Sequence, residues 1–364
     1  MISIVLELFQ NLCCCRGFSD ATIRVNDKRY RIQRLLGEGG MSFVYLVQLS
    51  KNPLIIDNGI ATPELYALKK IICPSVESIS NGMREIENYK RFQSPYVIKS
   101  IDSQVMQEKD GSKTIYIVLP YYSLGSLQDS INRRLLEGTF VSEAECVRIM
   151  LGVTRGLLCL HDPASRQDNA TSRVNVDAVS MTYSDETAML LEDTPLEMDM
   201  LSSNSAGSIA YAHRDITPSN ILFSSDGLPV IGDLGSCSQA DITIENRHQL
   251  SELQEWVNDN CTLPYTPPEL LNLKLNQVLS SKVDIWSLGC TFYTLMFGIS
   301  PFEREEQIHG ASLTYAINTG KYSFPRNSRF SEGLLSVIKK CIQVDPIQRP
   351  TTSQLLNLLQ DLDT

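Results

Sequence analysis

The 364-residue sequence lacks several features that mark particular classes of protein. It has no strong basic run and carries a net charge of −10, which is unfavourable for binding nucleic acid. Seven of its ten cysteines are scattered through apolar segments without a C-x-x-C pair, so neither a zinc site nor a disulfide framework is expected. They are typical of small core residues in a reducing, cytosolic environment. These seven are Cys73, Cys146, Cys159, Cys237, Cys261, Cys290 and Cys341.

The N-terminal segment lacks both the length of a membrane span and the basic residues of a secretory signal. Ile2, Val5, Leu6, Phe9 and Leu12 recur at helical spacing. A spanning helix needs about 20 apolar residues, and no basic residue precedes the apolar run, as a signal sequence would require. The pattern therefore predicts a short amphipathic helix.

Three adjacent cysteines, Cys13, Cys14 and Cys15, follow this segment. A thiol cluster beside an amphipathic helix is a good setting for S-palmitoylation, which would make a palmitoyltransferase a partner. Ile2 excludes N-myristoylation, because that modification needs Gly at this position. Two or three acyl chains together with an apolar helix face could anchor the chain stably to a membrane. The alternative is a docking helix packed on the folded domain, with the cysteines as filler.

The first feature that the sequence does have is an alternating pattern of apolar and polar residues, which predicts strands. The runs 30–36 and 43–47 flank a glycine-rich turn of the form G-x-G-x-x-S-x-V, whose third glycine is replaced by Ser42. Glycines allow a backbone to lie close to phosphates, although an ordinary hairpin would show the same pattern. The residues concerned are Leu36, Gly37, Glu38, Gly39, Gly40, Met41, Ser42, Phe43 and Val44.

A lysine inside an apolar strand follows. The strand 65–69 includes Ala67 and ends in Lys69, and the helical segment 83–92 offers Glu85 as its partner, with Glu87 as the second choice. The runs Val97–Gln107 and Thr114–Leu119 predict two more strands, which complete a five-stranded antiparallel sheet. Pro120, Tyr121 and Tyr122 come directly after Leu119 and lead into a mostly helical second half.

The second half begins with a predicted helix whose start at Ser142 and Glu145 has the form of an S-x-x-E capping box. Residues 162–210 then interrupt the helical pattern with nine acids and two bases, −9 + 2 = −7 of the chain's −10. We expect a disordered acidic insertion, which would carry phosphorylation sites, bind a basic partner, or serve only as a tolerated surface loop.

A carboxylate and a carboxamide stand five positions apart in His213-Arg214-Asp215-Ile216-Thr217-Pro218-Ser219-Asn220, on a loop broken by proline. Ile221-Leu222-Phe223 then predicts a short buried strand. An acid beside an amide suits a specific chemistry, in which the acid takes a proton from a hydroxyl group while the amide holds a metal bound to phosphate. A chance loop in some other enzyme is the alternative.

Further acidic residues of interest follow the loop along the chain. Asp233-Leu234-Gly235 lies 233 − 215 = 18 residues beyond the loop acid, and the segment that follows ends at Pro267-Pro268-Glu269. Within it, residues 249–257 predict a helical turn or two, and Thr262 comes just before the end. Asp284 lies near the start of a helix predicted over 281–298, which is apolar nearly all round and should be buried. Arg349 is a candidate ion-pair partner for Glu269.

In this order, the motifs resemble those of the eukaryotic protein kinases over about residues 28–362. The resemblance implies a bilobal α+β fold, with a five-stranded antiparallel lobe and one main helix over 28–120, a mostly helical lobe over 121–362, and an anchoring segment over 1–27. It also implies ATP and Mg²⁺, with Mn²⁺ as an alternative ion, and a protein substrate. ATP would lie against the Leu36–Val44 residues, Ala67, Lys69, Leu119, Tyr121 and Leu222.

The resemblance also assigns roles at the reaction centre. Asp215 would accept the hydroxyl proton, Asn220 and Asp233 would hold the metal ion, and Lys69 with Glu85 would position the phosphates. Thr262, Glu269, Asp284 and Arg349 would be structural, with Thr262 hydrogen-bonded to Asp215 and Asp284 to the catalytic-loop backbone.

Within the kinases, this chain resembles the Numb-associated kinase family in three features: the glycine-rich segment, the Asp-Leu-Gly-Ser element and the long activation segment. The resemblance is strongest to the lipid-anchored branch of that family, and within this branch to its fungal vacuolar-membrane member. This resemblance implies autophosphorylation and a role in membrane traffic or fusion on the cytosolic face of an endomembrane, either the vacuole or the Golgi. Thr217 departs from the pattern, because a lysine usually stands there. A pseudokinase that binds ATP or partners, or a small-molecule kinase, is therefore the alternative to an active protein kinase.

Overall fold

The computed structural model describes residues 21–50, 55–57, 60–62, 64–109, 111–165 and 209–363. The predicted amphipathic helix, the Cys13–Cys15 cluster and most of the acidic insertion lie outside these residues. The described chain forms two compact units. The first comprises residues 21–86 and 99–121, and the second comprises residues 87–98, 122–165 and 209–363.

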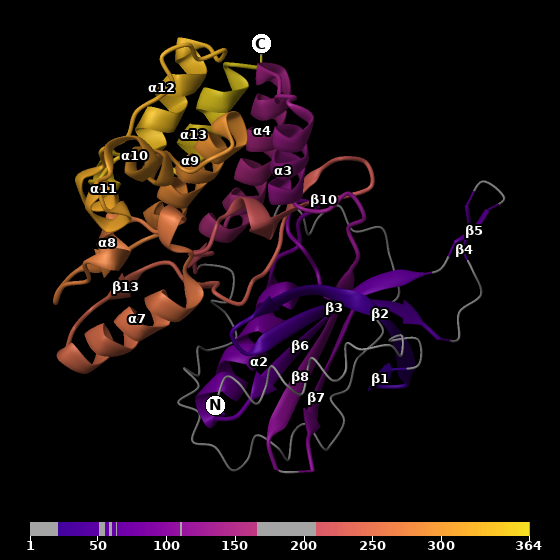
Figure 1. Ribbon diagram of the computed structural model, residues 1–364. Helices are drawn as coiled ribbons and strands as arrows, with labels where there is room; N and C mark the ends of the chain where they lie inside the picture. Colours follow the sequence, from indigo (N-terminus) through magenta and orange to yellow (C-terminus); the bar gives the residue numbers. More distant parts are fainter. Residues whose placement is uncertain are drawn as a thin grey trace. The chain divides into compact units, whose positions relative to one another are not determined.

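The first unit is built on a six-stranded antiparallel sheet in the order β1-β2-β3-β6-β8-β7 (Figure 1). The prediction of five strands was wrong by one edge strand, β1. This strand pairs with the start of β2 across a tight turn, in which Asn26 takes the left-handed conformation (φ 51°) that asparagine tolerates. Because β1 lies within residues 1–27, the sheet begins earlier than the expected boundary at residue 28. The strands are β1 (Thr22–Val25), β2 (Lys28–Gly39), β3 (Ser42–Leu49), β6 (Leu65–Cys73), β7 (Asp102–Gln107) and β8 (Lys113–Pro120), with β4 (Ile55–Asp57) and β5 (Ile60–Thr62) forming a separate pair.

The strand predicted over Val97–Gln107 begins only at Asp102. The apolar start of that run is used elsewhere, because Val97 and Ile98 are buried against Ile231 in the second unit. The backbone N–H of Ile98 donates to Ile231 O at 2.8 Å, and Ile231 N–H donates to Tyr96 O at the same distance. Periodicity alone could not separate this short packing segment from the strand that follows it.

Helix α2 (Val76–Arg91) is longer at its start than the predicted 83–92. The hydroxyl group of Ser75 accepts the N–H of Ser78 at 3.1 Å, so a serine closes the first turn. At Gly82 the helix lies so close to the sheet that a Cβ atom would stand 2.4 Å from Ile115 Cδ1. A larger residue at this contact between α2 and β8 would have to displace the end of the Ile115 side chain.

The second unit is mostly helical, and α9 (Lys282–Phe297) is buried along almost its whole length, as its apolar sequence predicted (Figure 1). A Cβ atom on Gly289 of α9 would lie 2.7 Å from Cys341 Cβ, so α12 packs directly on the α9 backbone. The other helices are α3 (Leu127–Glu137), α4 (Glu143–His161), α7 (Arg247–Asn260), α8 (Pro268–Leu271), α10 (Pro301–His309), α11 (Leu313–Thr319), α12 (Glu332–Cys341) and α13 (Thr352–Gln360). Short strand pairs join β9 (Tyr211–Ala212) to β12 (Ser238–Gln239), β10 (Ile221–Phe223) to β11 (Pro229–Ile231), and β13 (Ile242–Thr243) to β14 (Val278–Leu279).

Two local predictions need correction. Ser142 caps α4 by accepting Glu145 N–H at 3.2 Å, but Glu145 Oε1 binds Arg134 at 2.6 Å, so no reciprocal capping box forms there. The reciprocal box occurs instead at Ser126 and Asp129, at the start of α3. The helix predicted over 249–257 extends over all of α7, capped by the side chain of Asn246.

The seven scattered cysteines are free thiols, and all but the half-buried Cys261 are buried, as predicted. Among the described residues, no single helix is long and apolar enough to cross a membrane. The pair α9 and α10, bent by 64° at their junction, reaches that length and composition only when taken together.

Candidate active site

The predicted loop acid and amide meet directly in the second unit. After β9, the chain turns through a 3-10 helix at Pro218–Asn220 into β10, and this turn folds Asn220 back onto Asp215. Asn220 Nδ2 donates to Asp215 Oδ2 at 2.8 Å and to Asp215 O at 2.9 Å. The carboxamide nitrogen therefore orients the acid, and Oδ1 is the atom of Asn220 that suits a metal ion.

Asp215 is also bound from the activation segment, the stretch between Asp233 and Glu269. The backbone N–H of Thr262 donates to Asp215 Oδ1 at 2.9 Å, and the Thr262 hydroxyl group also hydrogen-bonds to the carboxylate. Burial raises the pKa of Asp215, and the nearby charge of Asp233 adds to this effect, while the Thr262 hydrogen bonds and His213 oppose it. The result is a fixed carboxylate that holds a proton more readily than an ordinary aspartate does.

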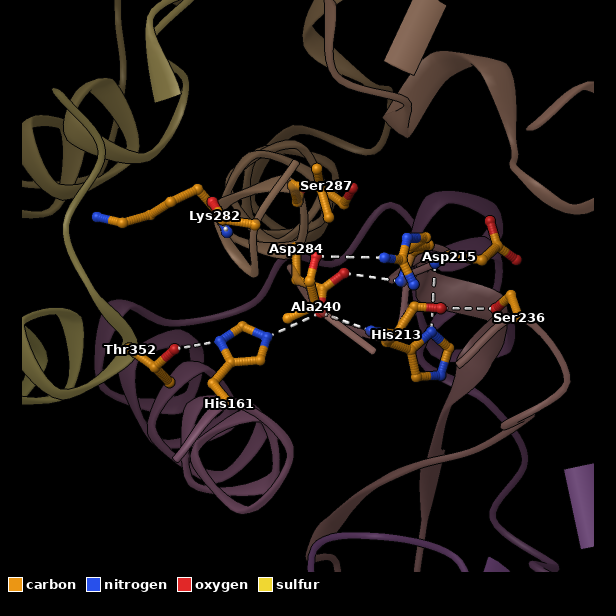
Figure 2. A network of polar contacts seen from close by, with 12 residues as sticks. His161, His213, Asp215, Ser236, Ala240, Lys282, Asp284, Ser287 and Thr352 are labelled. Carbon is orange, nitrogen blue, oxygen red and sulfur yellow. Dashed lines mark hydrogen bonds and ion pairs between the residues drawn. The ribbon is translucent and has the colours of Figure 1, made fainter. Parts of the chain in front are cut away.

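Asp284 fixes the backbone on which Asp215 stands (Figure 2). Its Oδ2 accepts His213 N–H and its Oδ1 accepts Arg214 N–H, both at 2.7 Å. Oδ2 also binds His161 Nε2 at 2.8 Å, and Nδ1 of the same ring lies 2.5 Å from Thr352 Oγ1. Although burial opposes the charge of Asp284, the bonds from His161 and the charge of His213 hold its pKa below the usual range. Asp284 therefore stays ionised as an acceptor only, so Nε2 of His161 carries the proton.

Arg214 holds the activation segment. The residue takes the left-handed conformation (φ 65°), and its guanidinium group donates to Ser238 Oγ and, at 2.6 Å, to Gln239 O. The same group lies over the ring of Trp256 on α7, with Cζ 5.9 Å from the centroid. Such a backbone conformation is costly and persists only where the surroundings determine it. Here Asp284 and the β9–β12 pair supply those constraints.

Asp233 lies in a loop fixed on its N-terminal side. The preceding Gly232 donates its N–H to Asn220 O at 2.7 Å, and its carbonyl oxygen bonds to His213 Nε2 at 2.9 Å. Asp233 itself has a positive φ of 44° and an exposed side chain. Leu234, which stands where kinases usually have phenylalanine, is fully buried.

The donor set fits a hard divalent cation bound together with phosphate. Among the described residues, no group of three or more His, Cys, Asp and Glu side chains could hold a metal ion. Mg²⁺ does not need one, because it usually binds one or two carboxylates together with substrate phosphates and water. Asp233 and Asn220 could supply two oxygen ligands of this kind, and the negative charge of Asp233 contributes to the raised pKa of Asp215.

In the first unit, the predicted nucleotide-binding side chains are aligned by strand register. Val44 of β3 pairs with Lys69 of β6, and Ala67, two residues earlier, pairs with Leu119 of β8. Because side chains alternate along a strand, these four project from one face of the sheet. Lys69 Nζ lies 2.7 Å from Glu85 Oε1 on α2, and both side chains are buried. Glu85, the first of the two expected partners, makes the ion pair, and Glu87 is exposed.

The glycine-rich segment forms the end of β2 and the turn into β3. A Cβ atom on Gly37 would meet nothing within 4 Å, and one on Gly39 would meet only Ser42 Oγ at 3.8 Å. Gly40 has a φ of +24°, a backbone conformation that glycine adopts more readily than residues with a side chain. The described residues leave space beside Gly37 and Gly39, as expected where a backbone approaches phosphates.

The remaining structural pair lies far from Asp215 in sequence. Arg349 donates to both oxygens of Glu269, at 2.6 and 2.8 Å, and also to the backbone carbonyl groups of Gln343 and Lys282. Its side chain is fully buried. This bidentate pair joins the end of the activation segment to the loop before α13.

The predicted residues thus fall into two groups. The sheet unit holds the glycine-rich segment, Ala67, Lys69, Glu85, Leu119 and Tyr121, and the helical unit holds Asp215, Asn220, Leu222, Asp233, Thr262, Glu269, Asp284 and Arg349. Each group comes together within its own unit. Thr217 is buried, and its carbonyl oxygen accepts Asn220 N–H at 3.1 Å.

Sequence reasoning missed three polar residues that hold the site: His161 at the end of α4, Ser236 after the Asp-Leu-Gly element, and Asn88 on α2. His161 binds Asp284, Ser236 Oγ donates to His213 O at 2.7 Å, and Asn88 donates to the backbone at Leu234 and Cys237. No sequence signal marked any of the three, because Asn88 lies among charged residues in Glu87-Asn88-Tyr89-Lys90 and its burial is visible only in the structure.

A glycine-rich strand turn, a Lys–Glu pair, an oriented loop aspartate and a loop that offers metal ligands together define a phosphoryl-transfer enzyme with the protein kinase fold. Residues 30–164 and 207–359 match the family described as "Protein kinase domain", and the chain belongs to that family. It is 34% identical over 342 residues to serine/threonine-protein kinase ppk13 of Schizosaccharomyces pombe, covering 93% of this chain and 92% of the relative. It is 30% identical over 351 residues to serine/threonine-protein kinase 16 of Homo sapiens, covering 96% and 95%. The protein is a serine/threonine protein kinase, a class that uses ATP and Mg²⁺ and phosphorylates proteins.

Proposed function

We propose that Asp215 is the proton acceptor of this kinase. The observation that carries the proposal is that both oxygens of its carboxylate accept hydrogen bonds. Asn220 holds Oδ2 and Thr262 holds Oδ1. The acid therefore cannot rotate away from a hydroxyl group that approaches it. Its raised pKa favours proton acceptance during the reaction.

In the proposed reaction, a Ser or Thr hydroxyl oxygen of the protein substrate forms a bond to the γ-phosphorus of ATP. The bond from that phosphorus to the β–γ bridging oxygen breaks, ADP leaves, and the hydroxyl proton passes to Asp215 Oδ. Autophosphorylation would follow the same steps on a hydroxyl group of this chain. The contribution of the enzyme is mainly positioning, because a loose phosphoryl transition state needs little covalent help.

Lys69 would bind the α- and β-phosphates, and Glu85 holds its ammonium group in place. Asn220 Oδ1 and Asp233 would hold Mg²⁺, which supplies positive charge to the phosphate oxygens when bound. Mn²⁺ accepts the same oxygen ligands and is proposed as a substitute ion. The backbone of Gly37–Val44 would cover the phosphates and exclude water.

The test is incubation of the purified full chain with labelled ATP and Mg²⁺, against an Asp215→Asn variant. Loss of a general base typically costs about 10²–10⁴-fold in rate, so label should be almost absent from the variant. Equal labelling of both proteins would end the assignment.

A pseudokinase is the second candidate, because Thr217 replaces the lysine that usually offsets the γ-phosphate charge. If that loss limits the rate, Thr217→Lys should raise kcat while leaving the KM for ATP nearly unchanged. An inactive parent protein that still binds ATP would favour the pseudokinase. A normal rate in the parent protein and no gain in the variant would show that Thr217 does not limit the reaction, and would reject the pseudokinase.

We further propose that the kinase is anchored to the cytosolic face of an endomembrane, most of all the vacuole, by S-acylation of Cys13, Cys14 and Cys15, and that it acts there on membrane traffic or fusion. The support is the amphipathic pattern of residues 2–12 followed by three adjacent thiols. Changing all three to serine should move the protein into the soluble fraction and abolish acyl exchange on the chain. Asp215→Asn, with its cysteines intact, is the matched control and should stay on the membrane. Unchanged membrane association of the triple variant would refute the anchor.

A further inference from the structure

Asn88 is a carboxamide buried in the middle of α2, with only 1% of its surface exposed. Its Nδ2 lies 3.1 Å from Leu234 O and 2.8 Å from Cys237 O. Both acceptors are backbone carbonyl groups, so the NH₂ end of the carboxamide must face them, and both of its hydrogens are used. Burying a carboxamide is unfavourable unless it is hydrogen-bonded, and here the two bonds go to one short stretch of chain.

That stretch is the turn directly after Asp233. Cys237 N–H donates back to Leu234 O at 3.2 Å and closes the turn, which Asn88 therefore binds at its first and last residues. Within the turn, Ser236 Oγ donates to His213 O. Gly232 on the other side of Asp233 is held by Asn220 and His213, so the backbone is fixed both before and after the carboxylate.

Asp233 needs such support, because its backbone lies in the left-handed region at φ 44° without being glycine. Non-glycine residues in this region are strained and hold the conformation only when their neighbours enforce it. On the C-terminal side, the N–H of Gly235 donates to Asp233 Oδ1 at 3.3 Å, and two side chains, Asn88 and Ser236, hold the turn that positions this amide. Loosening either contact should let the Asp233 carboxylate leave the direction that it has here.

We propose that Asn88 is a positioning residue for Asp233, and that it sets the affinity of the site for Mg²⁺ in the presence of nucleotide. The inference rests on the proposed role of Asp233 as a metal ligand. Asn88 lies one turn beyond Glu85 on α2, so the helix that carries the partner of Lys69 also carries the side chain that holds the metal loop.

The test compares Asn88→Leu with Glu87→Gln, a change at the exposed neighbour on the same helix, in the full chain. Calorimetry measures ADP binding with Mg²⁺ and with EDTA, and kinase assays measure the Mg²⁺ concentration that gives half-maximal rate. For Asn88→Leu we expect the gain in ADP affinity on adding Mg²⁺ to fall about tenfold, with metal-free binding unchanged. The half-saturating Mg²⁺ concentration should rise by a similar factor, and Glu87→Gln should match the parent protein.

Two further arms keep the inference testable if Asn88→Leu does not fold. Ser236→Ala removes the other side-chain support of the turn and should shift the Mg²⁺ dependence in the same direction. Asn88→Ser removes the carboxamide with a smaller change and should speed hydrogen exchange at the Cys237 amide. A variant that loses thermal stability or rate while keeping the parental Mg²⁺ dependence would reduce Asn88 to a packing residue and overturn the inference. If Asp233→Asn keeps the parental Mg²⁺ dependence, the proposed metal role of Asp233 fails, and the inference about Asn88 fails with it.

Discussion

The two units hold their parts of the active site by different physical means. In the sheet unit, strand register aligns Val44, Ala67, Lys69 and Leu119, and one ion pair to α2 completes the set. In the helical unit, key side chains are held by side-chain hydrogen bonds, several of them from distant segments: Asp284 lies 71 residues from His213, and Thr262 lies 47 residues from Asp215. The first arrangement depends on strand pairing and side-chain alternation, and the second depends on individual hydrogen bonds to loops. A substitution should therefore disturb the first locally and the second cooperatively.

The largest effect is expected at the bidentate pair of the helical unit. Arg349→Met leaves Glu269 buried without its partner, which should lower the free energy of unfolding by about 3–5 kcal/mol. Urea denaturation of the full chain measures this. The double change to Glu269→Gln with Arg349→Met should recover part of the loss, and a single variant as stable as the parent would contradict long-range anchoring in this unit.

A second prediction concerns Asp284, which fixes the loop backbone. Asp284→Ala leaves the His213 and Arg214 amides and the His161 ring without their acceptor, so Asp215 should shift. Misplacing a reacting group by about 1 Å can cost about 100-fold in rate, and kcat should fall by that order. Ser287→Ala on the same buried helix is the control, because Ser287 bonds Tyr265 O and Val283 O and not the catalytic loop. Equal loss in both variants would point to general damage to α9.

These contrasts explain what the sequence could and could not predict. The strands follow from a period of two, whereas the residues expected to face ATP came from the resemblance, and the strand register places Ala67, Lys69 and Leu119 on one face of the sheet. The extra strand β1 and the late start of β7 at Asp102 were missed, because a four-residue edge strand and a short packing run look alike in sequence. His161, Ser236 and Asn88 could not be found, because their partners are backbone atoms or side chains brought near only by folding.

In the sheet unit, Gly37→Ala should have a small effect confined to the bound state. The new Cβ atom meets nothing within 4 Å, so unfolding without nucleotide should change by less than about 0.5 kcal/mol. The KM for ATP should rise about fivefold, because the methyl group enters the space that the phosphates approach. A large loss of stability without nucleotide would mean that this segment, too, is held by tertiary contacts.

The smallest expected effect is a shift in pH dependence. The proposed proton acceptor, Asp215, can act only as a carboxylate, and burial raises its pKa, so activity should be lost as pH falls through a value above that of an ordinary aspartate. The Thr262 hydroxyl group opposes this rise. Thr262→Val should therefore move the acid limb of the kcat/KM profile to higher pH, while Thr262→Ser leaves it in place. A downward shift in the valine variant would reverse the assigned effect of the hydroxyl group.

The Glu269–Arg349 pair also has a consequence for how the enzyme is made. The sheet is complete once residue 120 has been synthesised, but the activation segment lacks its buried partner until residue 349 follows, 349 − 120 = 229 residues later. At typical rates of translation this interval is roughly 10–50 s. Through that time the emerging chain holds a complete sheet and an incomplete helical unit with exposed apolar helices. Chaperones should engage the nascent kinase in this interval, because exposed apolar surface makes an incompletely folded chain prone to aggregate.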